Sequence, residues 1–549
     1  MSKFIVFKSV DDMPEMAVSR GSMSWNKTGS WRSFTPIHRD KIPPCNYNCP
    51  AGEDIRGYID LIKKNKVAEA FALLTETNPF PAVCGRVCFH PCQADCNRHG
   101  FDIEIQVRLL EKFIGDWAIE NKKKSPLRET TGKKIAVVGA GPAGLAAAYY
   151  LHRKNLAVTV YDENHLPGGI LHYGIPSYRL AKDVLQAEIG RVLRGIEFKA
   201  NMRFGSDFDI GDLLDYDAVF LATGAHLSKK LNITGEHYPA VESGLDFLKR
   251  VNSGDSFDLE GKQVVVIGGG NTACDTARTA YRLGAAVSLV YRRTEKEMPA
   301  FAEEVEQLKS EPIEVQFLAA PQRIDRDDRG KLKVTFSRMK LGEPDRSGRA
   351  RPVPIKDSNF EISADTIFTA IGEDPNLSFF PEVRTKDDGS FDFSGVDQRL
   401  GGKLFVGGDI LPQPRTVPHA VASGRLAAEK IAAFLRGETL AVPQDIAEIA
   451  GPEDINYSYF TRVNRARWKS DLTVDGSLVD RDMALKEADR CFSCGVCSRC
   501  DNCYNFCPDL AVIRTPDGYQ VNLDYCKGCG ICVKECPGGS LVMEKSKTA

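Results

Sequence analysis

Two stretches of the chain repeat one order of apolar and polar positions. Each opens with a short run of β-branched and small apolar residues, Ile135–Val138 in the first and Gln263–Ile267 in the second. A glycine-rich turn follows, then an alanine-containing segment of helix length, then another apolar run, Ala157–Tyr161 or Ala286–Tyr291. Apolar runs of this length between such turns predict buried parallel strands joined by helices. The order therefore predicts an α/β fold with two doubly wound domains.

The first turn carries Gly139, Gly141 and Gly144 in the spacing G-x-G-x-x-G. In a dinucleotide-binding turn the first glycine allows the tight bend and the second lets the backbone approach a pyrophosphate. The third lets the helix pack on the strand. The next strand ends at Asp162, the acid expected about 20 residues further on to bind a ribose hydroxyl. We therefore expect a Rossmann-like FAD-binding domain here.

The second turn, within GGGNTACDTA, places Gly268, Gly270 and Ala273 in the same fingerprint. Its second strand ends in Arg292 and Arg293 instead of an acid. An acid accepts hydrogen bonds from a bare ribose, whereas arginine accommodates a 2′-phosphate. The pair therefore predicts NADP(H) in a second Rossmann-like domain. Because two arginines also suit a solvated surface, NAD(H) remains the alternative.

Further apolar runs are expected to complete these domains. Asp215–Gly224 predicts a buried strand ending in the turn where such chains cross between nucleotide domains, and Phe368–Asn376 predicts the return. The strand in GKLFVGGDI ends near Asp409, which is placed to bond the ribityl or phosphate part of FAD. The next helix, Thr416–Leu435, offers its N-terminus to the same cofactor.

Cysteines near the C-terminus form the most specific pattern in the chain. Two runs with the spacing C-x2-C-x2-C-x3-C-P begin at Cys497 and Cys526. In two-cluster ferredoxins the fourth cysteine of each run ligates the other cluster. We therefore expect a bacterial-type ferredoxin domain with two [4Fe–4S] clusters, with structural zinc as the alternative. The expected ligand sets are Cys497, Cys500, Cys503 and Cys536 for one cluster, and Cys526, Cys529, Cys532 and Cys507 for the other.

A count of cysteines predicts that the two ends of the chain meet. Of 17 cysteines, Cys274 lies inside a predicted helix and is interpreted as a small core residue. The C-terminal segment holds ten, two more than two clusters need, and the surplus pair is Cys491 and Cys494. The remaining sixteen form four sets of four only if this pair joins the N-terminal cysteines. These are Cys45, Cys49, Cys84, Cys88, Cys92 and Cys96.

Composition narrows the class of protein. Lys and Arg number 72 and Asp and Glu 74, so the formal net charge is −2 and gives no electrostatic reason to expect nucleic acid. The N-terminus lacks the apolar core and cleavage site of a signal peptide, and no apolar run is long enough for a membrane span. A cytoplasmic protein is therefore predicted, in which grouped cysteines favour metal ligation over disulfides.

The remaining segments divide the chain into domains. The first 40 residues have no clear period and are expected to lie as an arm over another domain, with disorder as the alternative. A helix pair is expected within Asp54–Thr77, a helix over Ile103–Asn121, and an exposed hairpin from Arg323 to Arg351. The expected domains are the arm (1–40), a helical domain with two [4Fe–4S] clusters (41–125), a FAD-binding domain in two parts (126–227 and 366–440) around the NAD(P)H-binding domain (228–365), a connector (441–490) and the ferredoxin domain (491–549).

From about residue 41 to 435 the chain resembles the NADPH-dependent glutamate synthase small-subunit family, with its relatives dihydropyrimidine dehydrogenase and the bifurcating NADH-dependent ferredoxin:NADP oxidoreductases. The matching stretches are CNYNCPAGEDI, CGRVC, GAGPAGLAAA, PGGILHYGIP, GGGNTACDTA, VYRR with MPA, and VGGD. The family normally has a CxxC a few residues before the position of Cys45. Here a matching stretch, RCFSCG, stands at Arg490–Gly495 instead, as the cysteine count independently requires.

The resemblance implies two clusters in the N-terminal domain. For the fourth ligand of one of them Cys84 is available, while some relatives use a Gln or Glu of the following helix, near Glu111 here. Both remain open. The other implied ligands are Cys45, Cys96, Cys491 and Cys494 for one cluster, and Cys49, Cys88 and Cys92 for the second.

The fingerprints and the resemblance together give the residues expected to bind FAD or NAD(P)H. They are Gly139, Gly141, Pro142, Ala143, Gly144, Asp162, Gly169, Ile170, Leu171, Ile175, Arg179, Thr223, Gly224, Gly268, Gly270, Asn271, Thr272, Ala273, Arg292, Arg293, Ala370, Ile371, Gly372, Gly408, Asp409, Thr416, Val417 and Ala420.

The resemblance implies an NAD(P)H-linked oxidoreductase that passes electrons between NAD(P)H, FAD and four [4Fe–4S] clusters. No G-x-S-x-G or H-E-x-x-H motif is present, so no catalytic acid–base residue is expected, and among nine histidines only His419 is singled out. A catalytic partner is expected near the ferredoxin domain, for example dissimilatory sulfite reductase or a 2-oxoacid, aldehyde or aromatic-acid oxidoreductase. An oligomer is compatible with the sequence. The alternative is a self-contained NAD(P)H:ferredoxin oxidoreductase, bifurcating or not.

Overall fold

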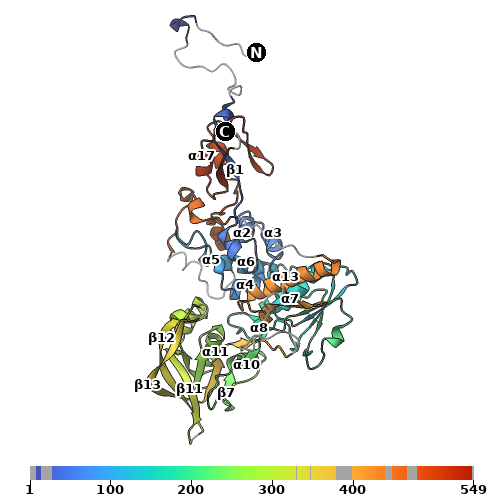
Figure 1. Ribbon diagram of the computed structural model, residues 1–549, viewed down its shortest axis with the longest axis vertical. Helices are drawn as coiled ribbons and strands as arrows, with labels where there is room; N and C mark the ends of the chain where they lie inside the picture. Colours follow the sequence, from blue (N-terminus) through green and yellow to red (C-terminus); the bar gives the residue numbers. More distant parts are fainter. Residues whose placement is uncertain are drawn as a thin grey trace.

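The computed structural model describes residues 8–13, 27–328, 330–345, 348–378, 398–438, 448–465 and 479–546. Figure 1 shows an elongated molecule whose parts follow one another along the long axis. Residues 8–13, in dark blue, lie at one end, the red C-terminal residues follow, and the blue N-terminal helices lie next to those. The cyan and orange elements follow, and the green and yellow sheet lies at the opposite end.

The first fingerprint lies in a six-stranded sheet. Its strands are, in spatial order, β16 (Arg399–Gly401), β17 (Leu404–Val406), β5 (Ala218–Leu221), β2 (Lys134–Val138), β3 (Ala157–Tyr161) and β4 (Glu197–Lys199). β16 pairs antiparallel with β17, and the other pairs are parallel. The helices of this part are α7 (Pro142–Arg153), α8 (Ile170–Tyr173), α9 (Lys182–Val192) and α13 (Val417–Arg436). The strands predicted for this domain and the helix predicted over Thr416–Leu435 are confirmed.

Helices α7 and α13 lie side by side (Figure 1) because both are rich in small residues. A Cβ on Gly424 of α13 would lie 2.1 Å from the carbonyl oxygen of Ala143 in α7. This close approach places the N-termini of both helices at the same edge of the sheet. The edge is the one at which the strands β2, β5 and β17 end, so the fold brings the fingerprint and the segment around Asp409 together.

The second fingerprint lies in a parallel five-stranded sheet. Its strands are, in spatial order, β10 (Glu314–Phe317), β9 (Ala286–Tyr291), β8 (Gln263–Gly268), β14 (Thr366–Ala370) and β7 (Val241–Ser243). Its helices are α10 (Gly244–Asn252), α11 (Asn271–Arg282) and α12 (Ala302–Ser310). Residues 366–370, which were expected to open the second FAD segment, are a central strand of this sheet, since they pair with β8 and β7. The crossing back therefore comes after Ala370. A two-stranded ribbon, β6 (Leu227–Ser228) with β15 (Glu373–Asp374), marks the two crossings.

The predicted exposed hairpin is part of a larger antiparallel sheet. Its strands are β11 (Ala319–Arg326), β12 (Leu332–Pro344) and β13 (Ala350–Ala364). The inner side chains Val334 and Phe336 are buried against Val265 and Ile367 of the five-stranded sheet. The alternation of apolar and charged positions here therefore indicates a sheet with one buried face, and only the outer face of that sheet is solvated.

The N-terminal domain is helical. Its helices are α1 (Pro44–Asn48), α2 (Ile55–Lys63), α3 (Val67–Leu74), α4 (Pro81–Val87), α5 (Pro91–Ala94) and α6 (Val107–Glu120). A helix from the other end of the chain, α15 (Arg481–Asp489), completes this core, because Ala484 and Ala488 pack with Ile59 and Leu110. Residues 481–489 were expected to be part of the connector (441–490), but they form a helix of the N-terminal core; residues 441–447 and 466–478 of that connector lie outside the described residues.

The described part of the N-terminal arm lies on the C-terminal domain. β1 (Phe34–His38) pairs antiparallel with β20 (Leu541–Lys545), and Gly29 donates to the carbonyl of Asp524. The other elements of that domain are α16 (Asn502–Asn505), β18 (Val512–Thr515), β19 (Gly518–Val521) and α17 (Ile531–Lys534). Among the described residues, none of the helices is both long and apolar enough to cross a membrane.

Candidate functional site

A cavity of about 880 Å³ lies between the six-stranded and five-stranded sheets. This volume is in the range that nucleotide and cofactor sites occupy. Most residues predicted to bind FAD or NAD(P)H line this cavity: Gly139, Gly141, Pro142, Ala143, Asp162, Gly169, Ile170, Ile175, Arg179, Thr223, Gly224, Gly270, Asn271, Thr272, Gly408, Asp409, Thr416, Val417 and Ala420. The other predicted residues stand outside its lining: Gly144, Leu171, Gly268, Ala273, Arg292, Arg293, Ala370, Ile371 and Gly372.

The first glycine turn has the geometry that its fingerprint requires. A Cβ on Gly144 would lie 1.8 Å from the carbonyl oxygen of Gly139, so only glycine lets α7 start this close to β2. A Cβ on Gly141 would meet nothing within 4 Å, so the backbone there faces open space in the cavity. Asp162 is buried and accepts a 2.6 Å hydrogen bond from the Ala140 backbone N–H. The acid therefore also holds the turn in place, a role its position in the fingerprint does not reveal.

Asp409 also lines the cavity, and it follows Gly408, where a Cβ would lie 2.8 Å from Cβ of Ala143 at the start of α7. Burial raises the pKa of its carboxyl to about 6, and one of its oxygens has no hydrogen-bond partner. A buried acceptor without a partner is costly, so the position calls for a hydroxyl or similar donor from a bound molecule. Nearby, Thr416 precedes α13 and its hydroxyl is 2.7 Å from Nδ1 of His419. Gly141, Asp409 and the starts of α7 and α13 thus fit FAD, with its pyrophosphate near the helix N-termini.

Replacing Asp409 with alanine is expected to weaken FAD retention about tenfold. A hydrogen bond to a charged group contributes on the order of 1.5–3 kcal/mol, and a tenfold change in affinity is about 1.4 kcal/mol. The ratio of flavin to protein after dilution and gel filtration measures the loss. Asp215→Ala, which removes an exposed acid of the same domain, is the matched control and should retain FAD as the wild type does. Equal retention in both variants would contradict the assignment of Asp409 to the flavin.

The two arginines that follow β9 do not serve the same role. Arg293 is buried, forms a 2.5 Å ion pair with Asp345 and donates to the carbonyl of Ala350. Its guanidinium therefore fixes the β12–β13 hairpin onto the end of β9. Arg292 is exposed, and burial of part of its side chain together with the charge of Arg293 lowers its pKa. The expectation that both arginines face a 2′-phosphate is therefore corrected, and Arg292 alone keeps that place.

Arg179 lines the cavity, but its guanidinium is engaged by protein groups. It forms ion pairs of 2.5 Å with Asp275 and 2.7 Å with Glu304, both in the second nucleotide domain. Burial raises the pKa of Asp275 to about 7, and Arg179 opposes that shift. Arg179 was predicted to bind a cofactor, yet its main contacts join the two nucleotide domains. Phe89 adds a contact with the helical domain by stacking on Phe301 at 5.4 Å.

Three thiols of the helical domain converge. Burial raises the pKa of the Cys92 thiol, and the nearby Cys49 and Cys88 thiols raise it further. The thiolate form that ligates iron is thus disfavoured here until a metal centre balances the charge. Val87, next to Cys88, lines the nucleotide cavity. This thiol set therefore adjoins the flavin side of the molecule.

Two buried glutamates lie against these thiols. Asn78 donates to Glu53 at 2.8 Å and to Glu111 at 3.0 Å, and Nε2 of His90 lies 2.9 Å from the other Glu111 oxygen. Burial raises the pKa of both glutamates, and each lies close enough to influence the other. Glu111 affects the pKa of both Cys49 and Cys88, and Cys84 lies beside Glu111 and Cys88. Glu53 and His90 were missed from the sequence, although a charged residue within CPAGEDI was the available signal.

The two ends of the chain meet at a second set of thiols. A small, largely apolar cavity is lined by Cys45, Cys96, Cys491 and Cys494. Burial raises the pKa of Cys45, and the three other thiols raise it further. Four thiols in an apolar enclosure match the ligand set of a [4Fe–4S] cluster. The structure thus brings together the four residues that the resemblance grouped, and it brings Cys491 and Cys494 to the N-terminal cysteines as the cysteine count required.

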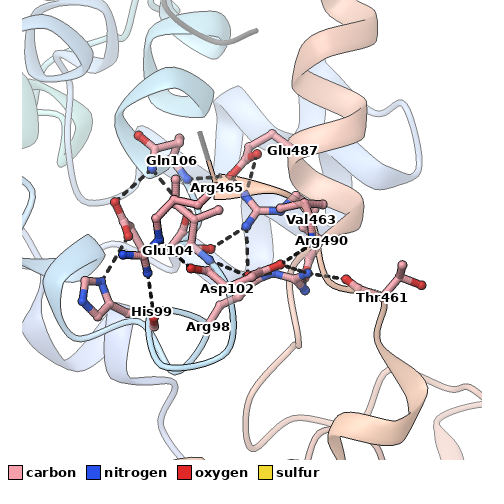
Figure 2. A network of polar contacts seen from close by, with 11 residues as sticks. Arg98, His99, Asp102, Glu104, Gln106, Thr461, Val463, Arg465, Glu487 and Arg490 are labelled. Carbon is pink, nitrogen blue, oxygen red and sulfur yellow. Dashed lines mark hydrogen bonds and ion pairs between the residues drawn. The ribbon is translucent and has the colours of Figure 1, made fainter. Parts of the chain in front are cut away.

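A buried polar network fixes the returning segment. Asp102 accepts two 2.8 Å hydrogen bonds from Arg98 and one of 3.3 Å from Arg490, and Figure 2 shows it between the two arginines. Burial alone would raise the pKa of Asp102, but Arg98 and backbone N–H donors bring it below its usual value. Arg490 also binds both oxygens of Glu487, at 2.7 and 2.8 Å, and Glu487 accepts from the backbone N–H of Gln106. The network holds the residue before Cys491 against the N-terminal domain.

The C-terminal thiols follow the crossed arrangement expected of two-cluster ferredoxins. The pKa of Cys497 is raised by burial and by the thiols of Cys536 and Cys500, and the pKa of Cys503 is raised to about 12 by burial and by the thiols of Cys497, Cys500, Cys532 and Cys536. Cys507 instead lines a cavity with Cys526, Cys529 and Cys532. Among the described residues, no group of three or more His, Cys, Asp or Glu side chains is placed to hold a single metal ion. Cys274, the cysteine outside all four sets, is buried in the core of the second nucleotide domain.

Comparison with known families decides the class. Residues 133–424 match the pyridine nucleotide-disulphide oxidoreductase family, and residues 39–123 match the dihydropyrimidine dehydrogenase domain II, 4Fe-4S cluster. Residues 519–542 match the 4Fe-4S binding domain. The chain belongs to the pyridine nucleotide-disulphide oxidoreductase family.

Three relatives of this chain are named as subunits or chains of NADP-linked enzymes. The chain is 37% identical to the NADP(+)-dependent formate dehydrogenase subunit beta of Moorella thermoacetica over 82% of its own length and 70% of that protein. It is 38% identical to the NADPH-Fe(3+) oxidoreductase subunit beta of Geobacter sulfurreducens, covering 73% and 65% of the two chains. It is 36% identical to the glutamate synthase [NADPH] small chain of Escherichia coli, covering 72% and 89%.

One solved structure is similar to part of this chain. It is Mycobacterium tuberculosis FprA in complex with NADPH, at 22% identity and a TM-score of 0.48, covering 57% of this chain and 87% of that one. The family matches establish an oxidoreductase with FAD- and nicotinamide-binding domains of Rossmann type and with 4Fe-4S domains on both sides. The predicted fold class and the resemblance to the glutamate synthase small chain are confirmed.

Proposed function

We propose that this family member carries electrons between NADPH and a separate catalytic subunit, through FAD and four [4Fe–4S] clusters. FAD when bound exchanges two electrons with a nicotinamide and single electrons with iron–sulfur clusters. The observation that carries the proposal is the meeting of Cys45 and Cys96 with Cys491 and Cys494. These four thiols place the N-terminal helical domain next to the C-terminal ferredoxin domain.

The order of the four ligand sets follows from their contacts. Val87 in the cavity wall adjoins Cys88 of the first set, and Cys92 of that set lies near Cys45 of the shared set. Cys494 of the shared set and Cys497 of the first ferredoxin set are three positions apart in the chain. The chain's own residues thus supply thiolates at successive steps from the flavin cavity to the C-terminal domain.

We assign Glu111 as the fourth ligand of the flavin-side cluster. Its carboxylate neighbours both Cys49 and Cys88, whereas Cys84 neighbours Cys88 and lies in the core shared with the flavin domain. Burial lowers the pKa of His90 to about 4, and its Nδ1–H donates to the carbonyl of Cys88 at 2.9 Å, so Nε2 of the neutral ring is an acceptor 2.9 Å from the second Glu111 oxygen. A proton on that oxygen, which the burial of Glu111 favours, would complete a hydrogen bond that orients the carboxyl group toward the iron.

We place the partner at the C-terminal domain. Cys500 and Cys529, one from each ferredoxin set, are exposed, and the apolar side chains of Phe506, Leu510 and Ile531 are also exposed around them. Apolar surface beside a redox centre is typical of a docking face for an electron-transfer partner. Two relatives are named as subunits of a formate dehydrogenase and of an NADPH-Fe(3+) oxidoreductase, and these names give examples of the reactions that such a catalytic subunit could carry out.

The isolated chain is expected to oxidise NADPH with viologen or tetrazolium dyes and to convert no metabolite. The test pairs the chain with the subunit that co-purifies with it and uses Cys526→Ser with Cys529→Ser, which removes the outer ferredoxin cluster. This variant should lose at least about tenfold in partner reduction, because the exit centre is gone, while flavin-level dye reduction persists.

Cys274→Ala, which changes a core cysteine outside the ligand sets, should reduce the partner at the wild-type rate. A pure chain that reduces added ferredoxin at full rate and has no co-purifying subunit would instead support the self-contained NAD(P)H:ferredoxin oxidoreductase. Conversion of a defined metabolite by the chain alone would contradict both functions.

A further inference from the structure

Three cationic side chains of the N-terminal domain donate hydrogen bonds to the segment around Cys491, Cys494 and Cys497. Arg98 donates to the carbonyl of Arg490 at 2.5 Å, and Lys63 donates to the carbonyl of Cys491 at 3.0 Å. Arg56 reaches further along the same segment and donates from one terminal nitrogen to the carbonyl of Cys497 at 3.4 Å. Cys497 belongs to the first ferredoxin set, so Arg56 contacts two ligand sets, while Arg98 and Lys63 contact the return segment of the shared set alone.

Arg56 also forms part of the wall around the shared thiols. It lies in the first turn of α2 and lines the cavity with Cys45, Cys96, Cys491 and Cys494. Its backbone N–H donates to the side-chain oxygen of Asn46, which fixes the start of the helix beside Cys45. The guanidinium therefore stands between the shared set and Cys497.

The two arginines of this wall use their donors differently. Arg98 donates from its Nε and both terminal nitrogens to Asp102 and to the carbonyls of Arg490 and Thr461. Arg56 keeps its Nε–H buried and without an acceptor in the described part of the chain. A buried donor left without an acceptor is costly, so its place beside four thiols calls for an acceptor that they would hold.

We propose that Arg56 is a positioning residue between two iron–sulfur centres, donating its buried Nε–H to a sulfur of the shared cluster while its terminal nitrogen holds the Cys497 peptide of the next. This rests on the proposed shared cluster and names the residue that sets its potential and couples it to the ferredoxin domain.

The expected consequence is electrostatic. Reduction adds one electron, and so one negative charge, to a cubane held by four thiolates, and no bond is made or broken. A hydrogen bond and a guanidinium charge beside the cluster both stabilise the reduced form more than the oxidised form. Arg56 therefore raises the reduction potential of the shared cluster and favours electron transfer into it from the flavin-side set.

The test is an EPR-monitored redox titration of the full-length holoprotein. In Arg56→Met the ratio of reduced to oxidised shared cluster at a fixed potential should fall about tenfold, which corresponds to 59 mV for a one-electron couple. Arg56→Lys, which restores the charge without the fixed fork of donors, should recover part of the shift. Iron content should stay at the wild-type value in both variants. NADPH-driven reduction of the ferredoxin clusters, followed by stopped flow, should slow in Arg56→Met.

Lys64→Met is the matched control, because it removes a positive charge at the other end of α2 from an exposed side chain paired with Asp60. It should leave all potentials unchanged. An unchanged potential in Arg56→Met with full iron would overturn the proposal, as would loss of about four irons, which would make Arg56 only a structural support. Failure of the shared cluster itself is a separate result, read from the iron content of the Cys491 and Cys494 variants.

Discussion

Changing Cys491 and Cys494 together to serine should remove about four of roughly 16 irons per chain, one cubane of four. The reason is that these two thiols complete a set with Cys45 and Cys96, and a cubane that loses two of four thiolate ligands is not retained. The pair lies some 400 residues from its partners (491 − 96 = 395), so the iron would be lost from the N-terminal domain by a change near the other end of the chain.

Iron and acid-labile sulfide analysis with EPR measures this effect. The ferredoxin signals should persist, because the eight cysteines from Cys497 to Cys536 remain. Cys274→Ala is the control, since it alters a buried cysteine of the second nucleotide domain that lies in none of the sets. Full iron in the double variant would rule out the shared cluster. Loss confined to the ferredoxin signals would show that Cys491 and Cys494 serve that domain instead.

The second large effect concerns the choice of coenzyme. Arg292→Ala should lower kcat/KM for NADPH by about tenfold to a hundredfold and leave kcat/KM for NADH nearly unchanged. Arg292 is exposed at the end of β9, where the adenosine ribose of a Rossmann-bound coenzyme is read. A charge-assisted hydrogen bond to a 2′-phosphate contributes on the order of 1.5–3 kcal/mol, and NADH has no such phosphate.

Arg293→Ala provides the comparison, because the neighbouring arginine is buried and holds Asp345 and the carbonyl of Ala350. It should lower the midpoint of thermal unfolding while the ratio of NADPH to NADH efficiency changes little. Steady-state kinetics with a viologen acceptor and both coenzymes decide the matter. A wild-type preference for NADH, or equal losses with both coenzymes in Arg292→Ala, would show that Arg292 has another role.

Local patterns in the sequence determined the nucleotide-binding elements. The strands β3 and β9 have the predicted bounds, and Gly144 makes the helix–strand contact that the fingerprint requires. Such features depend on residues within about 20 positions of one another, and a strand, a tight turn and a helix leave few ways to satisfy that spacing. The ferredoxin runs were equally readable, because thiolate spacing around a cubane is fixed by the cluster.

The cysteine count was also enough to predict that the chain's ends meet, but it did not say how. Only the tertiary structure places α15 in the N-terminal core and locks Arg490 between Asp102 and Glu487. Residues 481–489 carry five charged side chains among nine, and their Ala484 and Ala488 become core residues only because α2 and α6 supply the other half of the contact.

Side-chain direction and distant pairing were likewise decided in three dimensions. Arg292 and Arg293 are adjacent in sequence, yet one faces solvent and the other an ion pair with a hairpin some 50 residues later. Residues 366–370 join the second sheet because β8, about 100 residues earlier, offers its free edge. Successive side chains of an extended segment point to opposite sides, and which side meets a partner depends on elements that the local sequence does not contain.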